Sequence, residues 1–357
     1  MSTVQIRGEA VRRFIVDNVA KHPADITRRA AEKFACSRQA IHKHLQRLID
    51  EGCLLTHGAT RNRTYSLAAL VRWERDYELK PGLSEDAVWR LDIAPLLGKL
   101  PDNAEGIWHY GITEMINNVI DHSGGTILSV QVDKTAAATQ VQVFDDGVGI
   151  FRKIQAAMGL LDERHAVLEL AKGKFTTDPS RHTGEGIFFS SRAFDEFEIL
   201  SGDVYFSHEF HHDEDWIVQR PAASRAGGTL VRMRLNNHTS RRLNKVFAKF
   251  ASTVEPYGFN KTVVPVKLMR YGDDNLVSRS QAKRLIARFE RFKIVILDFT
   301  GVATIGQAFA DEVFRVFARQ HPEVDLVPMK VSAEVKRMIS RAQAHDSGEG
   351  LAPRNDH

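Results

Sequence analysis

The sequence predicts a multidomain chain that combines α+β and α/β architecture. The chain has 357 residues, which is enough for two or three domains. Helical periodicity and then a short hairpin pattern occupy the first seventy residues, whereas strand patterns recur between 128 and 235. Beyond residue 261 strands and helices alternate, which predicts a parallel sheet with helical crossovers.

The composition is that of an ordinary globular protein and argues against a membrane protein and against a secreted, disulfide-rich protein. The net charge of +4 does not by itself indicate nucleic-acid binding, although basic residues crowd the first seventy positions. No apolar run approaches eighteen residues and no signal-peptide pattern opens the chain, so we expect a cytoplasmic protein without membrane contact. Cys36 and Cys53 are too few for a disulfide framework, so we expect reduced, buried thiols.

The first seventy residues predict three helices and a hairpin. Helices are expected at 8–20, 25–34 and 38–49, with Asp25 and Ser37 as N-caps of the second and third. Two short strands are expected on either side of a turn at 57–63.

This order resembles the winged helix-turn-helix of bacterial regulators, with a domain at 1–70. The resemblance implies that the third helix enters the major groove of DNA and that the wing contacts phosphates. The side chains expected to contact DNA are Arg38, Gln39, His42 and Lys43 on the third helix, and Arg61 and Arg63 in the wing. The alternative is a small helical domain used for protein contact, whose charged faces are solvated.

A helix at 112–123 organises the middle of the chain, which we expect as a domain at 85–237 after a linker at 71–84. Its apolar stripe is flanked by Glu114, Asn118 and His122, spaced four residues apart on one polar face. An amide oxygen is a neutral hard ligand for Mg²⁺, and a carboxylate can orient or deprotonate a water. A solvated helix face is the alternative, because this spacing also occurs by chance.

Two glycine-rich motifs follow in order, and they favour a functional site over a solvated helix face. Strand patterns at 128–133 and 139–144 end in Asp-Asp-Gly-Val-Gly-Ile at 145–150, and Thr-Gly-Glu-Gly-Ile-Phe-Phe occupies 183–189. Together with the helix, these motifs resemble the GHKL-type ATP-binding fold of histidine kinases, gyrase-type topoisomerases, one class of heat-shock chaperones and MutL repair proteins. The resemblance implies an α/β sandwich with a mixed sheet that binds ATP and Mg²⁺.

The resemblance also implies a role for each motif residue. Asp145 would accept from the exocyclic amine of adenine, while Gly147 and Gly149 let the backbone approach the ring. Asn118 would bind Mg²⁺ and Glu114 would position the attacking water. The phosphates would lie against Thr183, Gly184 and Gly186 at a helix start. Lys174, with Lys172 and Arg181, lies in the region corresponding to a mobile lid; these cations either reach the phosphates or are solvated.

The C-terminal part is expected to contain a linker helix at 238–260, a domain at 261–345 and a polar tail at 346–357. The runs 295–302 and 305–307 resemble the STAS domain of anti-sigma-factor antagonists. Those antagonists carry a phosphorylatable serine where this chain has Gly306, Gln307 and Ala308, and Thr304 is the nearest hydroxyl. The resemblance therefore implies a STAS-like βαβ module for protein interaction or dimerisation.

These expectations combine into one hypothesis with two alternatives. We expect an ATP-binding, slowly hydrolysing bacterial DNA-binding regulator, in which Mg-ATP controls conformation, dimerisation or partner binding. A homodimer is expected by resemblance. The alternatives are a serine/threonine kinase of the anti-sigma type and a nucleotide-sensing scaffold without turnover. A sensor histidine kinase is disfavoured, because no dimerisation helix with an acceptor histidine precedes the ATP-binding motifs.

Overall fold

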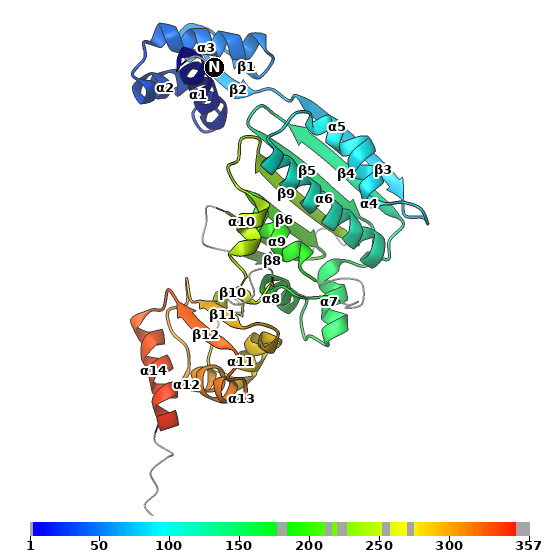
Figure 1. Ribbon diagram of the computed structural model, residues 1–357, viewed down its shortest axis with the longest axis vertical. Coiled ribbons are helices and arrows are strands. Elements are labelled where there is room, and N and C mark those ends of the chain that lie inside the picture. The colour runs from blue at the N-terminus through cyan, green and yellow to red at the C-terminus, as the bar shows by residue number, and fades with distance from the viewer. Residues whose placement is uncertain are drawn as a thin grey trace, which may run out of the picture.

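The computed structural model describes residues 3–176, 184–210, 216–219, 227–251, 258–269 and 275–347. Within them the chain forms an N-terminal helical unit, a central unit built on a large sheet and a C-terminal unit built on a small sheet. The three units follow one another along the longest axis of the molecule (Figure 1).

The N-terminal unit has the predicted order of three helices and a hairpin. Ser37 caps the third helix as predicted, since its hydroxyl accepts from the Ala40 amide at 3.2 Å. Asp25 is the N-cap residue of the second helix as predicted, but its carboxylate accepts from Arg28 at 2.7 Å and Arg29 at 2.8 Å instead of from a backbone amide of the first turn. Both cysteines are free and half-buried. The elements are α1 (Thr3–Asn18), α2 (Ile26–Phe34), α3 (Arg38–Asp50), β1 (Leu54–His57), the 3-10 turn η1 (Thr60–Asn62) and β2 (Thr64–Leu67).

The central sheet has the strand order β3-β4-β5-β9-β6-β7-β8, and every described pairing in it is antiparallel. The prediction of a mixed sheet is therefore wrong. The helical connection from β5 to β6 does give these two strands the same direction, but β9 lies between them and pairs with both. The strands are β3 (Val71–Glu78), β4 (Ile127–Lys134), β5 (Ala138–Asp145), β6 (Glu196–Ser201), β7 (Val204–Glu209), β8 (Trp216–Gln219) and β9 (Thr229–Asn236).

The predicted linker at 71–84 is also corrected, because most of it is β3. This strand pairs with β4 from Val71 opposite Lys134 to Glu78 opposite Ile127, at the edge of the sheet. Trp73 and Tyr77, two of its alternate residues, pack against the central core. Val71 also packs there, but the other five residues of the strand are charged, which hides the alternating pattern of a strand in the sequence.

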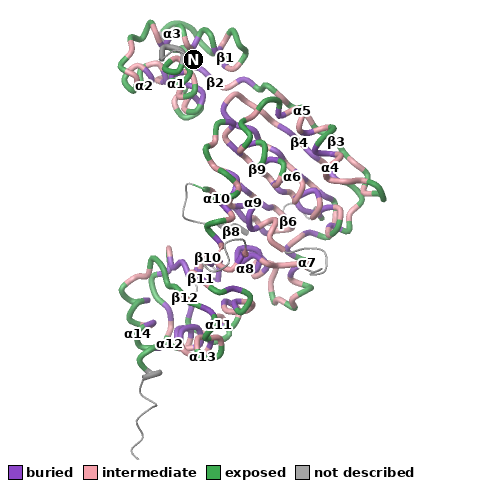
Figure 2. The backbone as a smooth tube through the Cα atoms, viewed as in Figure 1, coloured by how far each residue is buried: buried purple, intermediate pink, exposed green. Residues whose placement is uncertain are grey.

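Helices cover the apolar face of the central sheet. Ile112 and Ile116 of α6 and Val130 and Val143 of the sheet are almost fully buried in one core. Figure 1 shows α6 lying over one face of the sheet, and Figure 2 shows α8 almost wholly buried. The helical elements are α4 (Glu85–Val88), the π-turn η2 (Trp89–Ile93), α5 (Ala94–Leu97), α6 (Asp102–His122), α7 (Ile150–Met158), α8 (Arg164–Lys172) and α9 (Gly186–Ala193).

The C-terminal unit confirms the predicted parallel sheet, with the order β10-β11-β12. Asp325 donates its amide to the Lys293 carbonyl, and Met329 accepts from the Phe299 amide. These alternate residues of β12 therefore face β11, and Pro328 faces the open edge. The strands are β10 (Lys261–Pro265), β11 (Ile294–Asp298) and β12 (Asp325–Met329).

Helices fill the connections of this unit. The linker helix predicted at 238–260 is shorter, α10 (Leu243–Ala248), and the last helix extends to Ser347. The rest of the predicted polar tail lies outside the described residues. The remaining elements are η3 (Val266–Met269), α11 (Arg279–Ile286), η4 (Phe289–Arg291), α12 (Gln307–Asp311), the π-turn η5 (Glu312–Phe317), α13 (Ala318–Gln320) and α14 (Ala333–Ser347).

Candidate functional site

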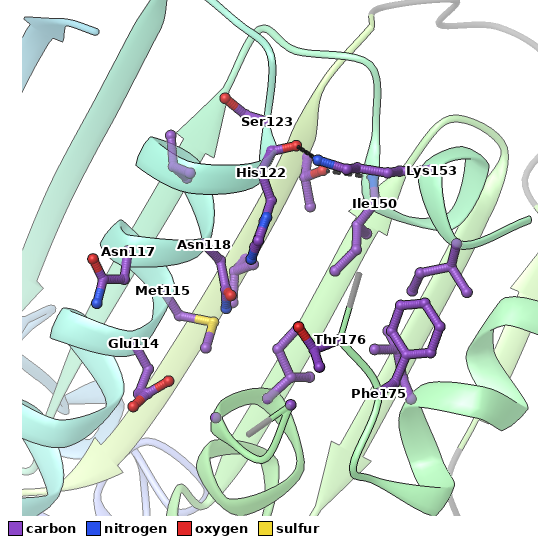
Figure 3. Close-up of a pocket in the computed structure, with 18 of the residues that line it drawn as sticks. Glu114, Met115, Asn117, Asn118, His122, Ser123, Ile150, Lys153, Phe175 and Thr176 are labelled. Atoms are coloured by element: carbon purple, nitrogen blue, oxygen red, sulfur yellow. Dashed lines mark hydrogen bonds between the residues drawn. The ribbon is translucent and has the colours of Figure 1, made fainter. Parts of the chain in front are cut away.

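A cavity of about 370 Å³ opens between α6, the loop after β5 and the start of α9 (Figure 3). It collects residues from the three motifs that the sequence singled out, although these motifs are far apart in the chain. Of the predicted residues, it is lined by Glu114, Asn118, Asp145, Gly149, Gly184 and Gly186.

One wall of the cavity is the polar face of α6. The apolar stripe of this helix, including Met115 and Val119, is buried against the sheet and fixes its rotation. Glu114, Asn118 and His122 consequently line the cavity, as Figure 3 shows. A carboxylate, an amide and an imidazole therefore lie in one row, which is the arrangement predicted from their spacing.

Asp145 ends β5 at the inner end of the cavity and is only 4% exposed. Its Oδ1 accepts from the Gly147 amide at 2.9 Å. Burial raises the pKa of the Asp145 carboxyl above its ordinary value, while hydrogen bonds from Gly147 and Thr229 oppose this rise. The site thus holds a buried hydrogen-bond acceptor whose charge is sensitive to its surroundings.

Thr229 was not predicted from the sequence, yet it lines the cavity beside Asp145. It is paired with Asp145 across β5 and β9, and its Oγ1 accepts from the Ile150 amide at 3.0 Å. No motif marks this residue, because only the register of two strands far apart in sequence brings it to the site. Ser123, Lys153, Phe175, Thr176 and Glu185 are further lining residues that the sequence analysis did not assign.

The neighbouring Asp146 has a structural role. Its carboxylate accepts from the Thr126 amide at 2.7 Å, the Thr126 hydroxyl at 2.6 Å and the Ile127 amide at 2.9 Å. The Thr126 and Ile127 hydrogen bonds lower the pKa of Asp146 to about 2. Of the two adjacent aspartates, therefore, one faces the cavity and the other holds the start of β4.

The glycines of the first turn have different roles. Gly149 lines the cavity with φ of 89°, and a Cβ there would lie 2.7 Å from the Ser201 hydroxyl. Gly147 does not line this cavity, so the predicted contact with a ring is not supported. A Cβ on Gly147 would lie 2.2 Å from the Ser123 carbonyl oxygen, so this glycine lets the loop pack against the end of α6.

The glycines of the second turn bring a helix start against Glu114. A Cβ on Gly186, the first residue of α9, would lie 2.0 Å from Glu114 Oε2. Gly184 has φ of 71° and packs against the Phe175 backbone. Glu185 lies between these glycines, and burial raises the pKa of its carboxyl. The predicted Thr183, like Arg181, lies outside the described residues.

Comparison with known families identifies one part of the chain. Residues 281–336 match the model of a STAS-like domain of unknown function (DUF4325). The C-terminal unit is a STAS-like domain. A search of curated proteins finds no match to this chain. Among the described residues, none of the helices has the length and apolarity needed to cross a membrane.

The STAS-like domain explains why two lysines that could have reached the phosphates, Lys172 and Lys174, do not line the cavity. Lys174 donates to the Arg291 carbonyl at 2.8 Å, and its ammonium lies 4.9 Å from the Phe292 ring centroid. Lys172 is fully buried and pairs with Glu169 at 2.6 Å. The sequence could not show that another domain supplies acceptors for these lysines. Lys153 lines the cavity instead and donates to the His122 carbonyl at 2.6 Å.

The donor set of the cavity fits Mg²⁺ bound to a nucleotide. The described residues contain no cluster of three or more His, Cys, Asp or Glu side chains that could hold a metal. Asn118 offers one neutral oxygen ligand, and Mg²⁺ commonly takes few protein ligands while keeping waters and phosphate oxygens.

The residues predicted to contact DNA are displayed on the N-terminal unit. The outward face of α3 exposes Arg38, Gln39, His42 and Lys43, and Arg63 is exposed beside β2. The opposite face of the helix buries Ile41 and Leu45 in the core. The side chain of Arg61 lies outside the described part of the chain. A basic and polar face is therefore available, and its partner stays a prediction.

Proposed function

We propose that the chain is an ATP-binding, slowly hydrolysing, DNA-binding regulator. The observation that supports this most strongly is the convergence of the α6 row, the turn after β5 and the turn before α9 on one cavity of about 370 Å³. This volume suits a small-molecule ligand. The convergence agrees with the resemblance to the GHKL-type fold, in which the same three motifs surround one nucleotide.

Adenine would lie at the inner end of the cavity, against Asp145. A buried carboxylate accepts a hydrogen bond from an exocyclic amine, whereas guanine presents a carbonyl oxygen at the matching position and would repel it. Thr229 supports the orientation of Asp145 by hydrogen bonding to it. Gly149 keeps the wall of the cavity free of a side chain beside this end.

The phosphates would lie between α6 and α9. The first amides of α9 lack partners within the helix, and Gly186 at the helix start lies against Glu114. Asn118 would bind Mg²⁺, which neutralises phosphate charge when it is present. Glu114 would orient a water toward the terminal phosphate, acting as general base.

The N-terminal unit supports DNA as the macromolecular partner. The order of three helices and a hairpin, with an exposed third helix, supports the resemblance to a winged helix-turn-helix. Arg38, Gln39, His42 and Lys43 are of the types that contact base edges and phosphates. The STAS-like domain would provide a second interaction surface for a protein partner or a second copy of the chain.

Phosphate release from Mg-ATP tests the proposal, with the wild type and Glu114→Ala compared and nucleotide binding followed in parallel. We expect slow turnover in the wild type, and binding without turnover in the variant. Wild-type turnover that persists in Glu114→Ala would remove Glu114 as base. Absence of ATP binding by the wild type would refute the proposed nucleotide site. Label from γ-labelled ATP that stays on protein would instead indicate a kinase.

A further inference from the structure

The STAS-like domain and the nucleotide cavity share a hydrophobic core. Leu168 of α8 and Phe188 of α9 are buried in one cluster with residues of the STAS-like domain. The Phe188 ring centroid lies 4.5 Å from that of Phe259, which in turn lies 5.4 Å from that of Phe292. Phe188 also lines the cavity. The helix that begins at the phosphate end of the cavity is therefore anchored in the neighbouring domain.

A buried charged cluster joins the same two domains. The Glu169 carboxylate of α8 accepts from Lys172 at 2.6 Å and from Arg288 of the STAS-like domain at 2.7 Å. Lys172 also donates to the carbonyls of Arg284 at 3.1 Å and Ala287 at 3.0 Å. Buried charges are tolerated when they are paired and hydrogen-bonded in good geometry. This cluster therefore favours one orientation of the STAS-like domain against α8.

Arg288 connects this cluster directly to the wall of the cavity. Its second guanidinium nitrogen donates to the Gly173 carbonyl at 2.8 Å, and its guanidinium carbon lies 5.3 Å from the Phe175 ring centroid. Phe175 lines the cavity and packs against Gly184 of the second glycine turn. Contacts therefore run without a gap from Arg288 through 173–175 to the turn expected to hold the phosphates.

We propose that Arg288 is a positioning residue for the nucleotide cavity and that the STAS-like domain is part of its scaffold. This inference rests on the proposed nucleotide-binding function and adds its regulation. If docking of the STAS-like domain holds 173–175 in the shape that binds nucleotide, bound nucleotide must stabilise the docking equally, because linkage is reciprocal. A protein that draws the STAS-like domain away from α8 would then release the nucleotide.

Calorimetric titration with Mg-ATP tests this in the full-length chain. We expect Arg288→Ala to weaken binding about tenfold, a typical coupling between two sites. Arg288→Lys should fall between the wild type and the alanine variant, because an ammonium keeps the charge of the guanidinium but lacks its two-pronged geometry. Arg341→Ala is the matched control, because Arg341 is exposed on α14, and its affinity should equal that of the wild type.

Hydrogen exchange on the wild type supplies a measurement independent of the variants. Saturating Mg-ATP should slow amide exchange at 284–292, outside the cavity. Wild-type affinity in a folded Arg288→Ala protein, or unchanged exchange at 284–292 on saturation, would overturn the inference and leave the nucleotide site intact. Failure of the wild type to bind Mg-ATP would overturn both proposals. If Arg288→Ala does not fold, Arg288→Lys and the exchange experiment decide.

Discussion

Replacing Asp145 by asparagine tests how the cavity would select its base. Oδ1 of Asp145 accepts from the Gly147 amide, and an asparagine oxygen can accept the same bond. This hydrogen bond within the turn should therefore survive the change. The other atom, however, becomes an NH₂ group that would face the exocyclic amine of adenine, so a donor would meet a donor.

The magnitude follows from burial of the side chain, which is only 4% exposed. A hydrogen bond to a charged group contributes about 1.5–3 kcal/mol, and a buried group left unpaired costs a similar amount. We therefore expect Asp145→Asn to lose at least about 2–3 kcal/mol of ATP binding, or roughly 30- to 150-fold in Kd. Discrimination against GTP should shrink in the same variant.

The assay is a titration of wild type and variant with Mg-ATP and Mg-GTP at several pH values. Burial raises the pKa of Asp145, and an amine donor prefers the ionised carboxylate. Wild-type affinity for ATP should therefore rise with pH through this raised pKa and then level off, whereas the asparagine variant should lack this component. Equal ATP affinities in both proteins, with thermal stability unchanged, would refute the assignment of Asp145.

Three further changes test other parts of the molecule. Gly186→Ala places a Cβ 2.0 Å from Glu114 Oε2, so the flexible carboxylate must move. Phosphate release should therefore fall, while the free energy of unfolding changes by about 1 kcal/mol or less. Normal turnover in this variant would contradict the role of Glu114. Asp146→Ala should lower the melting temperature at neutral pH, because three hydrogen bonds to the start of β4 are lost. The wild type should lose the same stabilisation as pH falls from about 4 toward the lowered pKa of about 2, and a melting temperature that rises there would oppose it. Lys43→Ala should weaken binding to DNA of any sequence. It should also reduce the slope of log binding constant against log salt concentration by about one, as measured by titration at several salt concentrations. An unchanged slope would remove Lys43 from the interface.

The sequence predicted well whatever depends on local pattern. Ser37 caps α3, and the row of Glu114, Asn118 and His122 lines one cavity, because helical spacing and capping chemistry act over a few residues. The parallel order of β10, β11 and β12 also followed from alternating strands and helices. These features need no knowledge of distant contacts.

Features set by distant contacts were missed. Thr229 reaches the site only through the pairing of β9 with β5, and the insertion of β9 made the central sheet antiparallel. The strand β3 was missed because charged residues outnumber its three apolar ones, Val71, Trp73 and Tyr77, and its partner β4 lies far along the chain. Lys174 was expected either to reach the phosphates or to be solvated, but its ammonium donates to the Arg291 carbonyl of another domain.

The position of Pro328 limits how chains of this kind can assemble. Among the described strands, β12 forms one edge of the parallel sheet, and unpaired backbone groups at such an edge invite a further strand. Pro328 has no N–H and faces outward, so an incoming strand would find a donor missing in the middle of β12. Growth of fibres by strand addition is therefore disfavoured here. Chains that join at the β12 edge would have to recognise each other by their side chains.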